Sequence, residues 1–215
     1  MPITLSPHPL LDPVAFVTRY PEPLGKMPTP PAVLAYFGTE TTAPLQTTPE
    51  VKVAVRELLR HGGFKPTGRN KPASEYLIKA VEKGWFGPDK GINLAVDMCN
   101  VVSLRSGLPI SVVDADRAKP PWRIAVTPPD TSYPFNPAGQ VIDIGGLLAL
   151  HDGLGPCGGP VKDSQRTKTD EQTRTTLSII WGTRALPGRA AEARDWYLEL
   201  CKASGLRSEE VSFDR

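Results

Sequence analysis

The sequence predicts an α+β fold with a mixed or antiparallel, sandwich-like sheet and flanking helices. Helical patterns gather towards the two ends of the chain and strand-like runs lie between them, an order typical of α+β proteins and not of doubly wound ones. The most apolar helical pattern lies near the middle of the chain, and the strand-like runs that follow it are short and bounded by proline and glycine.

The first 48 residues are rich in proline and threonine and hold two short apolar runs, at residues 14–17 and 32–37. Proline-rich segments of this kind punctuate a chain and interrupt regular elements. We therefore expect residues 1–48 to form an arm that lays one or two short strands or helices on the body. The body is expected to be a single domain over residues 49–215.

Two amphipathic helices are expected at the start of the body. The first covers residues 49–60, because Pro49 and Glu50 suit the first turn of a helix and a glycine pair follows the last turn. The second covers residues 74–83 and is stopped by Gly84.

The central helix, whose run over residues 94–104 is apolar almost all round, is typical of a buried helix. Asn93 suits its N-cap and Gly107 its C-terminal stop. The exceptions are three polar residues that a helix places in one stripe, namely Asp97, Asn100 and Ser103. Either this stripe is hydrogen-bonded to neighbouring backbone, since an unpaired buried polar group costs roughly 1–3 kcal/mol, or it faces a cavity. We expect Asp97 and Asn100 to point inward and to be hydrogen-bonded.

Five strand-like runs follow, at residues 110–114, 122–126, 140–143, 147–152 and 175–182. The first is mostly β-branched, and Gly145-Gly146 separates the third from the fourth. A last helix is expected over residues 189–202, where apolar residues recur at helical spacing before Gly205.

The composition is that of an ordinary globular protein, with 215 residues, a formal net charge of +2 and 24 prolines. Three cysteines without a framework spacing favour a reducing compartment, and no apolar run approaches the ~18 residues that a membrane span needs. We therefore expect a soluble, cytoplasmic protein without a membrane partner. The sequence leaves open whether it forms a homo-oligomer.

A glycine- and proline-bounded loop, residues 62–72, carries cations and no acidic residue. Charge of a single sign on a flexible loop suits phosphate contacts, although many such loops are solvated connectors. Because the overall charge is small, Lys65, Arg69 and Lys71 are the expected contacts to a nucleic-acid backbone.

Several common catalytic signatures are absent: the chain has no Gly-Lys-Ser/Thr P-loop, no strand–GxGxxG–helix unit and no GxSxG elbow. His151, Asp152 and Cys157 lack the spaced partners of a zinc site, so neither a metal nor another cofactor is expected. The loop over residues 157–173 alternates hydroxyls and cations around glycines. It suits binding of a phosphate or a polar ester, unless it is a surface hairpin whose hydroxyls cap turns.

Two blocks of the chain together resemble a known family. The pattern Val-Asp-x-x-Asn-x-Val-Ser-Leu-x-Ser-Gly-Leu-Pro-Ile within residues 93–116, followed by Gly158-Gly159, Asp163-Ser164 and Thr173, is similar to the B-three/B-four domain of the phenylalanyl-tRNA synthetase beta subunit. The likeness covers about residues 50–185 and includes no synthetase catalytic domain, so the chain resembles a free-standing relative. The resemblance implies a three-layer α/β unit with a β-sandwich.

The resemblance also implies an activity, because the family's domain is an editing pocket that hydrolyses the ester of mischarged tRNA by attack of a positioned water. It implies Gly158 and Gly159 as backbone donors, with Asp163, Ser164 and Thr173 orienting substrate or water. Pro160-Val161-Lys162 separates the glycine pair from Asp163, which leaves the amino acid open. We add three further candidates: His151 as a base near this loop, Thr167 within it and the stripe residues Asp97 and Asn100 as substrate contacts.

The sequence therefore predicts an editing deacylase that acts in trans on mischarged aminoacyl-tRNA. A non-catalytic tRNA- or RNA-binding module of the same fold is the alternative, and an unrelated small-ligand binder ranks third. Deacylation of a panel of mischarged tRNAs separates the first two.

Overall fold

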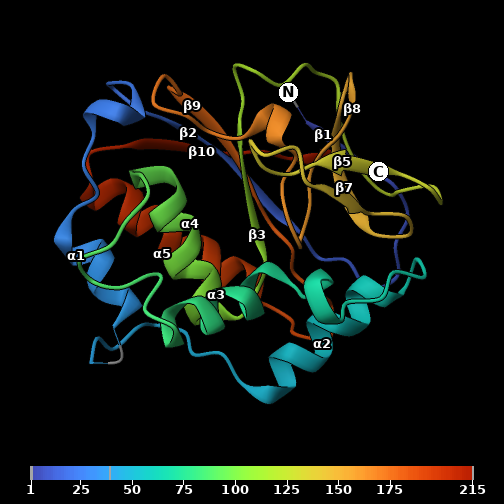
Figure 1. Ribbon diagram of the computed structural model, residues 1–215, viewed down its shortest axis with the longest axis horizontal. Coiled ribbons are helices and arrows are strands. Elements are labelled where there is room, and N and C mark those ends of the chain that lie inside the picture. The colour runs from blue at the N-terminus through green and yellow to red at the C-terminus, as the bar shows by residue number, and fades with distance from the viewer. Residues whose placement is uncertain (1, 39, 215) are drawn as a thin grey trace.

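The computed structural model describes residues 2–38 and 40–214, and its helices and strands form layers (Figure 1). The helices are α1 (Pro31–Leu34), α2 (Pro49–Arg60), α3 (Ala73–Glu82), α4 (Leu94–Ser106) and α5 (Arg189–Ala203), with short 3-10 turns η1 (Leu24–Lys26), η2 (Ala35–Phe37), η3 (Gly68–Asn70) and η4 (Gln165–Thr167). The strands are β1 (Ile3–Leu5), β2 (Val14–Arg19), β3 (Ile110–Asp114), β4 (Trp122–Val126), β5 (Ser132–Pro134), β6 (Val141–Asp143), β7 (Leu148–Asp152), β8 (Gly155–Gly158), β9 (Thr175–Ile180), β10 (Arg207–Glu210) and β11 (Phe213–Asp214).

A four-stranded sheet, in the order β10-β2-β9-β3, forms the middle layer and is antiparallel throughout. Its side chains alternate between two hydrophobic cores, as the pleat of a strand requires. Phe16 and Ile180 belong to the core shared with α4 and α5. Ala15 and Ile179 belong to the core shared with the second sheet. The middle layer therefore has helices on one face and a sheet on the other.

The second sheet has five strands in the order β11-β1-β4-β7-β8. Strand β1 pairs in parallel with both β11 and β4, whereas β4, β7 and β8 pair antiparallel. The register of β7 and β8 shifts between Leu150 and His151. A separate two-stranded hairpin is formed by β5 and β6. The prediction of an α+β fold with a mixed sheet and flanking helices is confirmed.

Helix α4 is the buried centre of the helical layer, as its sequence predicts. The Asn93 side chain accepts a hydrogen bond from Val96 N–H at 3.0 Å and caps the N-terminus. Gly107 ends the helix at φ 74°, a left-handed conformation that favours glycine. Buried residues lie all round α4, and Tyr197 of α5 donates a hydrogen bond to Ala95 O at 3.3 Å.

The N-terminal segment contributes strands to both sheets. Strand β1 lies between β11 and β4, and β2 lies between β10 and β9. The division of the chain at residue 48 stays a prediction, and residues 1, 39 and 215 lie outside the described residues. In the described ranges, each helix is too short or too polar to cross a lipid bilayer.

Candidate functional site

A cleft of about 1170 Å³ opens between helices α3 and α4 on one side and the β5–β6 hairpin with residues 161–168 on the other. Its wall brings together cations from three separate parts of the chain, which are Arg69, Lys71, Lys79, Lys162 and Lys168. Amide side chains and aromatic rings also line the cleft, from Asn70, Asn100, Asn136, Gln140, Tyr76, Phe86 and Phe135. We call this feature the cationic cleft.

The cations of the cleft are held near one another without carboxylate partners. Within the described residues, none of the five forms an ion pair, and Asp143 is the carboxylate that contributes to the lining. The neighbouring ammonium of Lys79 lowers the pKa of Lys71. Burial, followed by the charges of Lys168 and Arg69, lowers the pKa of Lys162. An anion in the cleft would relieve this repulsion.

Lys168 is half-buried in the wall of the cleft. Burial lowers the pKa of its ammonium, and the charge of Asp163 acts in the opposite direction. Lys162 is placed differently, because its Nζ lies 3.6 Å from the centre of the Phe135 ring. This is a cation–π contact, which orients the lysine and the ring together at the hairpin side of the cleft.

Helix α4 forms the floor of the cleft, and the three residues of its polar stripe have different surroundings. Ser103 is buried and donates to Leu108 O at 2.7 Å. Asn100 is half-buried and lines the cleft, and its side chain makes no hydrogen bond to the described residues. The expectation that Asn100 would be hydrogen-bonded is therefore wrong, because its side chain faces the open cleft and not a packed backbone.

Asp97 points into a different part of the molecule. It is fully buried, accepts from Thr29 Oγ1 at 2.6 Å and from Ile92 N–H at 2.8 Å, and so confirms the inward, hydrogen-bonded position predicted for it. It lines a second cavity of about 660 Å³ with both partners. Burial raises the pKa of Asp97, and the two hydrogen bonds oppose that rise. Asp97 and Asn100 therefore line two different cavities.

Asp163 is held in a turn against the glycine pair. Its Oδ1 accepts from Gly159 N–H at 3.0 Å and its Oδ2 from Val112 N–H at 3.3 Å. Burial raises the pKa of Asp163 to about 6, against the effect of these hydrogen bonds and of the Lys168 charge. Asp163 is next in sequence to Lys162 of the cleft but is not itself among the residues that line the cleft. Gly159 N–H is occupied by Asp163 and is not the free backbone donor that the resemblance implies.

Side chains of neighbouring residues pack closely against the backbone of Gly158. A Cβ on Gly158 would lie 3.2 Å from both Asp163 Oδ1 and Val113 Cγ1, tighter than most real contacts. Close packing around Asp163 therefore explains why a glycine occupies position 158.

The other candidates from the loop are buried and bonded within the protein. Ser164 Oγ accepts from Arg166 N–H at 3.4 Å, and Thr167 Oγ1 donates to Cys157 O at 2.8 Å. Thr173 Oγ1 donates to Asp114 Oδ2 at 2.7 Å. These hydroxyls stabilise turns, and none of them is among the residues that line the cationic cleft.

His151 and Cys157 also lie away from the cleft lining. Both are buried. Burial, followed by the charge of Arg123, lowers the pKa of His151. Burial raises the pKa of the Cys157 thiol far above its usual range, so the thiol is not ionised at neutral pH. The described residues contain no group of three His, Cys, Asp or Glu side chains placed to bind a metal.

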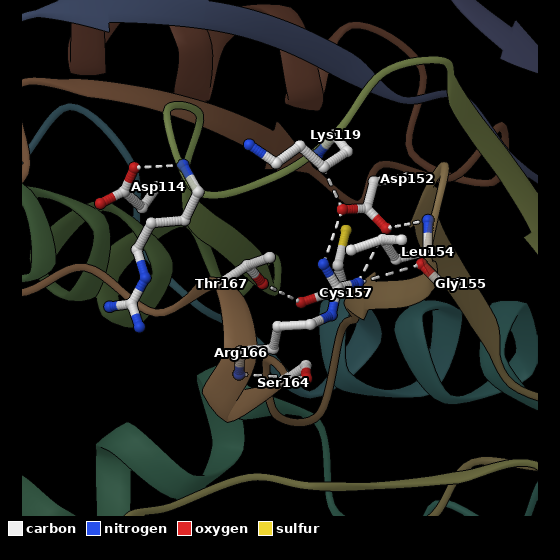
Figure 2. A network of polar contacts seen from close by, with 10 residues as sticks. Asp114, Lys119, Asp152, Leu154, Gly155, Cys157, Ser164, Arg166 and Thr167 are labelled. Carbon is white, nitrogen blue, oxygen red and sulfur yellow. Dashed lines mark hydrogen bonds and ion pairs between the residues drawn. The ribbon is translucent and has the colours of Figure 1, made fainter.

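Arg166 and Asp152 form a network that sequence reasoning missed (Figure 2). Arg166 Nη1 and Nη2 donate to Asp152 Oδ2 at 2.7 Å and Oδ1 at 2.8 Å. The same carboxylate accepts from Lys119 N–H and Leu154 N–H, each at 2.9 Å. Burial alone would raise the pKa of Asp152, but these hydrogen bonds outweigh it and hold the pKa below its usual value.

Of the three residues predicted to contact nucleic acid, two line the cationic cleft and one does not. Arg69 and Lys71 line the cationic cleft, whereas Lys65 is exposed and lies outside its lining. Lys79, Lys162 and Lys168 join them through the fold. Their separation along the chain hides this convergence from sequence reasoning.

Comparisons with known proteins give a weak fold relationship. No family model and no curated protein matches the chain. A similar solved structure is an N-terminal fragment of the phenylalanyl-tRNA synthetase beta subunit from Pyrococcus horikoshii, with 13% sequence identity and a TM-score of 0.48. The match covers 56% of this chain and 42% of that one, so this chain spans less than half of the length of the fragment it matches.

Proposed function

We propose that this protein hydrolyses the ester bond of a mischarged aminoacyl-tRNA in trans, with the 3′ end of the tRNA bound in the cationic cleft. The observation that carries the proposal is the cleft itself, where five cations that form no ion pair with the described residues meet amide side chains and aromatic rings. The residue pattern shared with the tRNA-editing domain supplies the reaction.

The chemistry of the lining suits a single-stranded RNA end. Phosphates are bound chiefly by lysine and arginine, and unpaired bases stack on aromatic rings. The contact of Lys162 with the Phe135 ring puts both kinds of group at one place. At about 1170 Å³ the cleft is large enough for a terminal nucleoside with its amino acid, since ligand sites measure roughly 300–1000 Å³.

In the proposed reaction a water oxygen attacks the aminoacyl carbonyl carbon while its proton passes through a bridging water to Asp163, which does not itself line the cleft. The carbon–oxygen bond to the ribose then breaks, and the ribose oxygen leaves with that proton as a hydroxyl. A base with a pKa of about 6 is matched to this task near neutral pH. The free amide of Asn100 and the ammonium of Lys168 are assigned to the developing oxyanion. No protein nucleophile is needed.

One observation favours a non-catalytic RNA-binding module as the second candidate. The hydroxyls of Thr167 and Thr173 and the N–H of Gly159 are all engaged in internal hydrogen bonds. These groups are therefore not available to a substrate without rearrangement. The two candidates share the cleft and differ only in whether the ester is cleaved.

The experiment is a deacylation assay with a panel of mischarged tRNAs, with tRNA binding measured in parallel. We expect the parent protein to accelerate ester hydrolysis. Asp163→Asn should slow it by about 10²-fold or more, the scale of general-base catalysis, with little change in tRNA affinity. Asp143→Asn removes the carboxylate that lines the cleft and is the matched control. Binding without acceleration by the parent would establish the module and reject the deacylase.

A further inference from the structure

Two aromatic side chains are exposed beside the cationic cleft. Tyr76 and Trp85 are 53% and 54% exposed, and within the described residues they are the aromatic side chains that are largely in solvent. The other three of the four tryptophans, Trp122, Trp181 and Trp196, are buried. Single exposed apolar residues are common, but a neighbouring pair at the edge of a cleft indicates a contact surface.

The backbone at the end of α3 holds the two rings together. Gly84, at φ 67°, donates to Val81 O at 2.8 Å, and Trp85 N–H donates to Ala80 O at 2.8 Å. These two bonds form a Schellman motif, which fixes the residue after the glycine against the last turn of the helix. The ring centres of Tyr76 and Trp85 are 6.3 Å apart and their planes meet at 44°. We call this pair the aromatic lip.

Cations surround the aromatic lip and continue into the cleft. Lys83 Nζ lies 4.8 Å from the centre of the Trp85 ring. Tyr76 lines the cleft together with Lys71 and Lys79, and the ammonium of Lys79 lowers the pKa of Lys71. The lip therefore presents ring faces beside positive charge, at the rim of the cavity.

We infer that the aromatic lip stacks unpaired bases of a single-stranded RNA end as it enters the cationic cleft, with Lys71, Lys79 and Lys83 binding its phosphates. The inference rests on the proposed function, because it gives the same cleft an RNA ligand, and it adds the entry surface and the required single-stranded form. Every base has a π-face, so the stacking is tolerant of sequence. A base stacked inside a duplex does not offer that face.

The test uses the full chain and the fluorescence of Trp85, the exposed tryptophan. A short single-stranded oligoribonucleotide of mixed sequence should quench its emission, and a blunt duplex at the same phosphate concentration should quench it far less. Measured by the fluorescence anisotropy of a labelled oligonucleotide, which does not depend on Trp85, Trp85→Ala and Tyr76→Ala should each weaken single-strand binding roughly 5- to 150-fold, the range for loss of one base–aromatic stack. Trp85→Phe retains a stacking ring and should bind within about threefold of the parent.

Leu154→Ala is the matched control, since Leu154 is an exposed apolar residue on the turn between β7 and β8. The inference is overturned if both alanine variants of the lip bind the single strand as Leu154→Ala does, or if the duplex quenches Trp85 equally. Quenching by a partner protein but not by the oligonucleotide would also overturn it, by assigning the lip to a protein contact.

The deacylation assay separates this inference from the proposed function. Selective single-strand binding through the lip without ester cleavage supports the inference and rejects the deacylase. If the protein cleaves the ester but its lip variants bind the single strand as the parent does, the inference about the aromatic lip is rejected and the proposed function is not.

Discussion

Arg166 and Asp152 form a bidentate pair in which the two guanidinium nitrogens lie 2.7 and 2.8 Å from the two carboxylate oxygens. The Asp152 side chain is fully buried and that of Arg166 is 34% exposed. The pair joins the end of β7 to η4, and the segment between them carries Lys162 of the cationic cleft. It therefore positions the wall of the site without lining it.

Loss of the Arg166 guanidinium should destabilise the fold. Arg166→Met leaves a buried carboxylate with only its backbone donors, so the free energy of unfolding should fall by about 1–3 kcal/mol. Arg117→Met is the control, since the Arg117–Asp170 pair is exposed and should matter by about 0.5 kcal/mol or less. Denaturant unfolding measures the change in the free energy of unfolding for both variants, and equal changes would contradict a structural role for the Arg166–Asp152 pair.

The Arg166–Asp152 pair also sets a pH dependence of stability. Because the folded pKa of Asp152 is depressed, its contribution is complete above the unfolded pKa of about 4 and is lost as the pH falls through the lower folded value. Unfolding measured against pH should show this loss in the parent protein. Asp152→Asn should lack it.

Asp163 should control the pH dependence of deacylation. The proposed base must be ionised, so kcat/KM should be flat above the pKa of about 6 and fall about tenfold per pH unit below it. The sign for stability is opposite to that of Asp152: a carboxyl whose folded pKa is raised makes the folded state less stable as the pH rises from about 4 to 6. Asp163→Asn should remove both dependences, and an unchanged rate profile would contradict the assignment.

Cys157 should be dispensable for hydrolysis. Its thiol is buried, and burial raises its pKa far above the usual range, so almost no thiolate exists to act as a nucleophile. Cys157→Ala should retain the rate within about twofold once the folded fraction is matched by circular dichroism. An inactive but folded Cys157→Ala protein, with Asp163→Asn active, would show that the mechanism is covalent.

The cations of the cleft should contribute to the salt dependence of tRNA binding. Arg69→Ala and Lys71→Ala should each flatten the log–log slope by roughly 0.7–0.9 and weaken binding about equally for different tRNAs. Lys65→Ala is the control, because Lys65 belongs to the same loop but lies outside the cleft lining. A slope that changes equally in all three variants would place the contacts on the loop and not in the cleft.

Asp97 and Asn100 should respond oppositely to replacement by leucine. Asp97→Leu leaves the Ile92 N–H and Thr29 hydroxyl without their acceptor, so the free energy of unfolding should fall by about 1–3 kcal/mol or more. Asn100→Leu breaks no such bond and should change it by about 0.5 kcal/mol, while impairing substrate binding. Thermal unfolding of the two variants compares them, and equal stability would contradict the buried role of Asp97.

The sequence alone determined the elements whose signals are local. Asn93 and Gly107 mark the two ends of α4 because capping and a left-handed turn depend on residues within a few positions. The all-round apolar pattern of α4 likewise predicted its burial, since periodicity reports how many faces of a helix meet other residues. The same reasoning located β3, β4 and β9.

Only the tertiary structure decided which distant groups meet. The pairing of β1 with β11 joins the two ends of the chain, and Thr173 binds Asp114 across 59 positions, so a hydroxyl that suits a ligand in the sequence is a structural donor in the fold. Asn100 was expected to be bonded and instead faces the cleft. A sequence pattern gives the face of the helix or strand on which a side chain lies. The partner that the side chain meets on that face is set by long-range packing. Such packing brings Arg69, Lys79 and Lys168 to one cavity.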